Sequence, residues 1–159
     1  MIDRPRTIVV LMLLWALLAG IFLFYGIYSL ETVINVPEWS SEAPDVGNFQ
    51  NSFEKIVPIL HFGFLMSTVI FLVFSSVFVI FAYGTYRKEQ WVWTTGLIIS
   101  TIFLAIFSLM LASFMVNVMM FKDDFSISGL VSITILFLTD LGVIFYLTRP
   151  GAKIYFETK

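Results

Sequence analysis

The hydrophobic pattern divides the chain into four long apolar stretches separated by polar segments. The stretches cover residues 8–30, 59–84, 91–121 and 127–147. A helix rises about 1.5 Å per residue and a bilayer core is about 30 Å thick, so a membrane span needs roughly 20 apolar residues. None of the stretches has the alternating polarity of a barrel strand. The pattern therefore predicts an all-α integral membrane protein with four transmembrane helices, the third long enough to tilt or to emerge from the bilayer.

The polar segments predict how these helices connect. Segments 85–90 and 122–126 are short, so the helices that they join are expected to be antiparallel neighbours in an up-down bundle of four. Segment 31–58 is predicted to be one larger outer loop. We expect turns in its first half and, before Pro58 redirects the chain, a short amphipathic helix on the membrane surface. A tail over 148–159 completes a single transmembrane domain of 159 residues.

The basic residues predict the orientation of the chain. Cytoplasmic flanks of membrane helices carry an excess of Lys and Arg. The chain has nine such residues, and only Lys55 and Lys122 fall in the predicted outer segments. The others flank the chain ends and the second connection: Arg4, Arg6, Arg87, Lys88, Arg149, Lys153 and Lys159. We therefore predict a protein of the cell membrane with cytoplasmic N and C termini, whose inner basic side chains extend to anionic headgroups.

Composition excludes several kinds of chemistry. Hydrophobic residues make up 59% of the chain and charged residues 13%, far from the balance of a soluble domain. Without cysteine the chain forms no disulfide, thiolate metal site or iron–sulfur centre, and its one histidine cannot build an imidazole cluster. A net charge of −2 without a basic patch argues against nucleic acid as a partner. No phosphate-binding loop, metalloprotease motif or serine elbow is present, so we predict neither a cofactor nor catalysis by this chain alone.

Asp140 is the only charged residue well inside an apolar stretch. An Asp at mid-membrane costs about 2.5–3.5 kcal/mol on insertion scales, so it needs a role. Counting along the helices predicts that Trp15, Ser76, Ser100 and Thr101 lie at a similar depth. This polar layer is either a protonatable site, as in proton-coupled carriers, or a buried carboxyl group that fixes helix register through hydroxyl and indole donors. The lack of a second ionisable group at this depth favours the structural role.

Small residues recur at four-residue spacing along the apolar stretches. This spacing allows two helix backbones to approach closely. The pairs are Ala16 and Gly20, Gly63 and Ser67, Gly96 and Ser100, and Ser108 and Ala112. They predict that several helix faces pack against other helices, some of them in other subunits.

The outer end of the predicted bundle contains His61, Met115 and Met119. Imidazole and thioether groups suit Cu(I), and the two methionines share a helix face at i, i+4. Methionine is also an ordinary gap-filling residue in membrane helices. We predict no metal site and keep copper binding as an alternative.

Short motifs at the two ends of the chain resemble a known group of proteins. Residues 4–7 (RPRT) run directly into the first helix, and residues 146–150 (YLTRP) end the last one. Both are similar to the ends of small, uncharacterised prokaryotic proteins with four transmembrane helices. The resemblance implies a prokaryotic origin and this topology, but no activity.

These observations lead to one functional hypothesis with two alternatives. The lack of catalytic motifs, the small-residue faces and the acidic outer loop favour a non-catalytic accessory subunit of a larger membrane complex, such as a respiratory or monooxygenase assembly. Its partners would be the lipid bilayer and other membrane subunits. The first alternative is a small proton-coupled transporter that uses Asp140, and the second is a copper-associated membrane protein.

Overall fold

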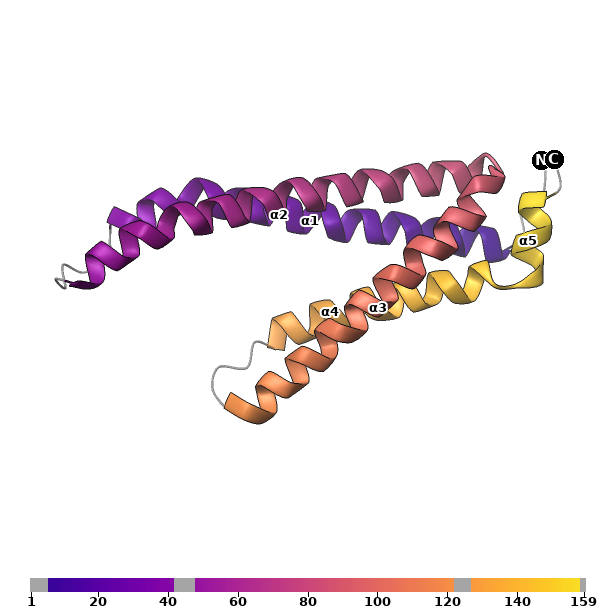
Figure 1. Cartoon of the computed structure of the whole chain (residues 1–159). Coiled ribbons are helices and arrows are strands. Elements are labelled where there is room, and N and C mark those ends of the chain that lie inside the picture. Colours follow the sequence, from indigo (N-terminus) through magenta and orange to yellow (C-terminus); the bar gives the residue numbers. More distant parts are fainter. Residues whose placement is uncertain (1–5, 42–47, 122–126, 158–159) are drawn as a thin grey trace. The chain divides into compact units, whose positions relative to one another are not determined.

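A computed structural model describes residues 6–41, 48–121 and 127–157, and within these ranges every regular element is a helix (Figure 1). The helices are α1 (Arg6–Ser41), α2 (Asn48–Tyr86), α3 (Gln90–Phe121), α4 (Ile127–Leu147) and α5 (Pro150–Glu157). Four of them are long and apolar enough to cross a bilayer, over Arg6–Asn35, Ile56–Tyr86, Gln90–Val116 and Gly129–Leu147. The prediction of an all-α, multi-pass membrane protein is confirmed in the helical structure and in the number of long apolar helices among the described residues.

The four long helices leave much of their apolar surface uncovered by the chain. At most 33% of the residues in the most apolar window of any span are buried. Large side chains such as Leu13, Phe24, Ile59 and Leu109 are more than half exposed. Because hydrocarbon offers no hydrogen bonds, the backbone in such a medium is helical and side chains of this kind face lipid or another apolar helix. The exposed apolar surface therefore indicates contact with a lipid bilayer.

The segment predicted as an outer loop is more helical than expected. Helix α1 continues past Pro37, and α2 has already begun ten residues before Pro58, so much of segment 31–58 belongs to long helices. Pro58 lies inside α2 and does not end a shorter helix. A proline removes only one backbone donor, and neighbouring helical turns sustain a long apolar helix around it. Residues 42–47 lie outside the described residues.

The chain divides into two compact units. The two-helix unit is Ala19–Val77 and contains the second part of α1 and the first part of α2. Two serine hydroxyls cross between its helices: Ser29 Oγ donates to the Phe64 carbonyl and Ser75 Oγ to the Ala19 carbonyl, each at 2.9 Å. These two bonds pair residue 19 with 75 and residue 29 with 64, so the two helices are antiparallel.

The five-helix unit consists of Met1–Leu18 and Phe78–Lys159. A tight turn joins α2 to α3: the Glu89 amide donates to the Gly84 carbonyl (2.9 Å) and the Lys88 amide to the Thr85 carbonyl (3.3 Å). This pair of bonds is a Schellman cap, with Lys88 in the left-handed conformation at φ 61°. Helix α3 then packs against α4.

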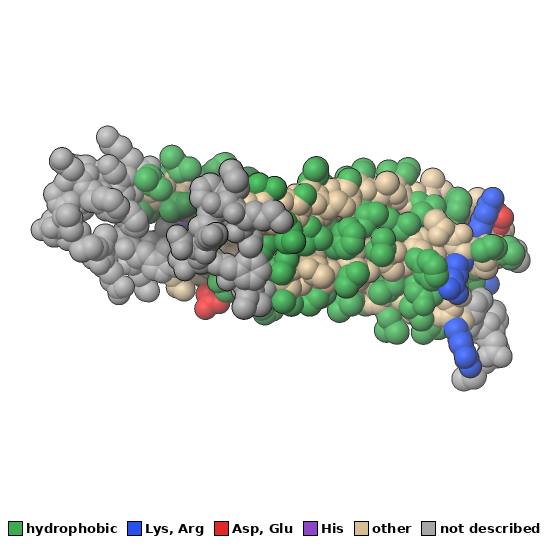
Figure 2. Space-filling view, turned by 90° about the horizontal axis from the view of Figure 1, so that it is seen from below, with side chains coloured by type: hydrophobic (Ala, Val, Ile, Leu, Met, Phe, Trp, Pro, Cys, Tyr) green, Lys and Arg blue, Asp and Glu red, His purple; other side chains and the backbone are tan. Residues whose placement is uncertain are grey.

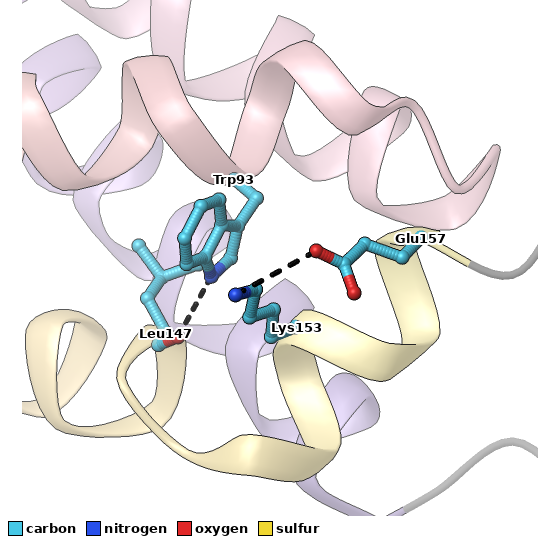
Figure 3. Close-up of polar contacts among 4 residues, drawn as sticks. All are labelled: Trp93, Leu147, Lys153 and Glu157. Carbon is cyan, nitrogen blue, oxygen red and sulfur yellow. Dashed lines mark hydrogen bonds and ion pairs between the residues drawn. The ribbon is translucent and has the colours of Figure 1, made fainter.

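Most of the predicted tail forms helix α5, which packs against the rest of the five-helix unit. Ala152, Tyr155 and Phe156 form its buried face, at a spacing of three and four residues. The Tyr155 hydroxyl donates to the Thr85 carbonyl at the end of α2 (3.3 Å). On the exposed face, Lys153 pairs with Glu157 at 3.8 Å (Figure 3). The tail therefore folds onto the end of the helices rather than leaving them.

Candidate functional site

A fully buried tryptophan, Trp15 on α1, lies in the interior of the five-helix unit. Its ring centroid is 5.7 Å from that of Phe78 and 4.9 Å from that of Phe81, both on α2. On the side of α3, a Cβ added at Gly96 would lie 3.1 Å from Trp15 Cζ2. The absence of a side chain at Gly96 thus lets the indole lie directly against the α3 backbone, which links α1, α2 and α3.

Two further polar residues lie in the same interior. Ser100 on α3 and Asp140 on α4 are fully buried, and the Ser100 hydroxyl lies beside the Asp140 carboxyl. Ser100 is one helical turn beyond Gly96, against which the Trp15 ring packs. The structure therefore brings polar groups from three helices into one layer of the five-helix unit, which we call the Asp140 layer (Trp15, Ser100 and Asp140).

The Asp140 layer has unused hydrogen-bonding capacity. Both carboxyl oxygens of Asp140, the Ser100 hydroxyl and the Trp15 indole nitrogen are buried without a completed hydrogen bond. Each such group costs about 1–3 kcal/mol when it is left unpaired. A carboxyl, a hydroxyl and an N–H together offer donors and acceptors for a water molecule or a transferable proton. In the described part of the chain, no basic side chain pairs with Asp140.

The other two residues predicted for this layer lie elsewhere on their helices. Ser76 and Thr101 are exposed, and each hydroxyl donates to the carbonyl one turn earlier in its own helix. Ser76 Oγ bonds to the Leu72 carbonyl at 2.9 Å and Thr101 Oγ1 to the Leu97 carbonyl at 2.7 Å. A hydroxyl bonded in this way is already satisfied in an apolar medium, so neither residue needs a partner helix.

The predicted helix-packing residues fall into two groups. Gly96 is buried against Trp15 and Leu147 within the five-helix unit. None of the others is fully buried by the chain. A Cβ at Gly20 or Gly63 would meet no atom within 4 Å, and Ser67 is half-buried. The remaining positions are exposed: Ala16, Ser108 and Ala112. Most of the small-residue faces are therefore open.

The basic residues of the predicted inner interface gather at one end of the five-helix unit (Figure 2). Four of them lie over aromatic rings, an arrangement that suits the headgroup region of a membrane. The distances to the ring centroids are 5.8 Å for Arg87 over Tyr83, 4.9 Å for Lys88 over Tyr155, 4.5 Å for Arg149 over Phe145 and 5.9 Å for Lys153 over Trp93. Arg6 is exposed in the first turn of α1, and Arg4 lies outside the described residues.

The candidate copper ligands are distributed over both units. His61 is half-buried in the two-helix unit, Met115 is exposed in the five-helix unit, and the Met119 side chain lies outside the described ones. Among the described residues, no three His, Asp or Glu side chains are grouped so that they could hold a metal ion.

The contacts that hold the two-helix unit together were not predicted from the sequence. Ser29 and Ser75 make its interhelical hydrogen bonds, and a Cβ at Gly26 would lie 3.0 Å from Leu72 Cδ2. The sequence signal for such hydrogen bonds is a serine inside an apolar stretch, because a hydroxyl in hydrocarbon must find an acceptor. The sequence does not reveal whether that acceptor is on the same helix or on the next.

Comparison of the chain with protein-family models, with curated proteins and with solved structures finds no match.

Proposed function

We propose that the protein is a non-catalytic accessory subunit of a larger membrane complex, such as a respiratory or other oxidative enzyme assembly. The observation that carries this proposal is the openness of the small-residue faces. Gly20 and Gly63 have nothing within 4 Å of an added Cβ, and Ala112 is exposed. In membranes, small residues serve the close approach of another helix, so these faces are suited to helices from other chains.

The proposed orientation places both chain ends in the cytoplasm of the cell membrane. It is supported by the gathering of Arg6, Arg87, Lys88, Arg149 and Lys153 at one end of the five-helix unit. Basic flanks are retained on the cytoplasmic side during insertion. The acidic segment 31–58 would then lie at the outer side and offer a second surface to partner subunits.

Isolation of the native complex tests this proposal. An affinity-tagged full-length chain is purified from native membranes in mild detergent, and its mass is measured by native electrophoresis. We expect the chain to migrate with other membrane subunits at constant stoichiometry. Recovery of the chain alone, in detergents that preserve known complexes of the same membrane, would contradict the proposal.

Two substitutions in α2 test whether the face around Gly63 contacts the partner subunits. Gly63→Leu adds bulk on the open face of α2 and is expected to release the partner subunits, because the backbones can no longer approach. Val69→Leu is the control, since Val69 is an exposed, already bulky residue of the same helix. Equal partner recovery with both variants would exclude this face as the interface.

A second candidate function is proton-coupled transport through the Asp140 layer. It is favoured by the buried carboxyl oxygens of Asp140 and the Ser100 hydroxyl, which lack completed hydrogen bonds. Such groups could exchange a proton with a water molecule that enters the layer. The test is proton flux into vesicles that contain the purified chain. Flux abolished by Asp140→Asn would support transport, whereas flux equal to that of protein-free vesicles would exclude it.

A further inference from the structure

An apolar groove of about 740 Å³ opens on the surface of the five-helix unit, between α1 and α2. Its volume is within the range of ligand-binding pockets. Helix α1 lines it with positions from Val9 to Ala16, and α2 with positions from Val79 to Tyr86, each at i, i+3, i+4 and i+7. Ala16 and Ala82 are the smallest of these side chains, and they leave the space between the two helices unfilled.

The groove has one apolar end and one end with basic residues. Its lining spans eight residues on each helix, and the seven rises between them amount to about 10 Å along the axis. Tyr83 and Tyr86 line it where α2 ends, and Arg87 follows directly, with its guanidinium 3.5 Å from the Tyr83 hydroxyl. On α1, exposed Arg6 stands one turn before Val9 and on the same helix face. Both arginines therefore flank the same end.

Arg87 is available for an anionic ligand. It is exposed, and its guanidinium contacts the hydroxyl and the ring face of Tyr83. Within the described side chains, no carboxylate lies at ion-pair distance from it, and Glu89, two residues later, is not paired with it. A phosphate at this position would meet a guanidinium and a phenol donor.

We propose that this groove binds one anionic phospholipid, with an acyl chain between α1 and α2 and its phosphate at Arg87. The apolar length of about 10 Å accommodates the first part of an acyl chain below the headgroup. Because Arg6 and Arg87 flank the same end of the groove, they favour a lipid with a net negative charge over an apolar helix or a zwitterionic lipid, whose phosphate is already balanced by its own cation. Ala16 belongs to one of the predicted small-residue pairs, but Ala82 and Arg87 belong to none, so loss of the lipid effects at Ala82 and Arg87 would leave the proposed subunit role untouched.

Native mass spectrometry of the detergent-solubilised chain tests the lipid site. The protein is mixed with phosphatidylglycerol or with phosphatidylcholine at equal concentration, and bound lipid is counted. We expect one phosphatidylglycerol to be retained in preference to phosphatidylcholine. Arg87→Gln should reduce its retention about five-fold. Arg149→Gln, which removes an exposed arginine away from the groove, should not change it.

Two further variants test the acyl chain. Ala82→Trp, and separately Ala16→Phe, place bulk inside the groove and should remove the bound lipid, while circular dichroism verifies that each variant is helical. Retention unchanged by the filling variants, or equally reduced by Arg87→Gln and Arg149→Gln, would overturn the proposal. So would a lipid-free dimer that Ala82→Trp dissociates, because a second copy would then occupy the groove.

Discussion

The Trp93 indole nitrogen, near the start of α3, donates a 2.9 Å hydrogen bond to the carbonyl of Leu147, the last residue of α4 (Figure 3). The last carbonyls of a helix have no partner within the helix, and in an apolar medium an unpaired carbonyl is costly. One tryptophan therefore satisfies the end of α4 and fixes it against the beginning of α3. Helix α5 starts three residues later, so this bond also determines where α5 can dock.

Replacing Trp93 should destabilise the five-helix unit. Trp93→Phe keeps a ring but removes the donor, and we expect a loss of about 0.5–1.5 kcal/mol in the free energy of unfolding in detergent. Trp91→Phe is the control, because Trp91 is exposed and contacts Phe81 only through its ring. Thermal unfolding followed by circular dichroism measures both, and equal midpoints for the two variants would contradict this role of the indole nitrogen.

Glycine positions should respond to alanine according to the space around them. An added Cβ at Gly84 would overlap Cγ2 of the fully buried Val92, so Gly84→Ala should cost about 1–3 kcal/mol. Gly63 has open space, and Gly63→Ala should be neutral or stabilising by up to about 1 kcal/mol, because alanine is the better helix former. Unfolding of the isolated chain in detergent distinguishes the two, and a stable Gly84→Ala variant would show that the α2–α3 turn is looser than described.

Docking of α5 should depend on its buried face. Tyr155→Ala removes a buried ring, the hydrogen bond to Thr85 and the ring beneath Lys88, so α5 should detach. Ile154→Ala is the neighbouring control, since Ile154 is 62% exposed. We expect faster amide hydrogen exchange over 150–157 in the tyrosine variant only. Similar exchange in both variants would mean that Tyr155 does not hold the helix.

The existence and type of the four long helices could be predicted because their physical cause is local. An apolar stretch of sufficient length in hydrocarbon has to satisfy its backbone within itself. The ends were harder to predict, because proline signals turns through local preference only. Helix α1 continues past Pro37 and α2 runs through Pro58, where the neighbouring turns maintain the helix.

For the residues of the candidate site, the depth along each helix could be predicted, but not the side of the helix on which each residue lies. Ser100 and Thr101 are adjacent in sequence and nearly equal in depth, yet one is buried beside Asp140 and the other is exposed. Successive residues in a helix point about 100° apart, and a helix that is apolar on all sides has no pattern that identifies its inner face. Sequence spacing therefore could not separate Trp15 and Ser100 from Ser76 and Thr101.

The short helix α5 could have been predicted from its residue pattern. Ala152, Tyr155 and Phe156 follow a helical spacing, and Pro150 suits the first position of a helix. The element is too short to be recognised by the apolar length that identifies a membrane span. Its amphipathic pattern was the better guide to its position.

We propose that the chain crosses the membrane four times with both ends in the cytoplasm, and single-cysteine labelling tests this central claim most directly. The native chain has no cysteine, so each introduced thiol is the only one that reacts. A membrane-impermeant maleimide applied to intact cells should label Glu42→Cys and Lys122→Cys. Lys88→Cys and Glu157→Cys should react only after the membrane is permeabilised. Labelling of Glu42→Cys and Glu157→Cys from the same side would contradict the account.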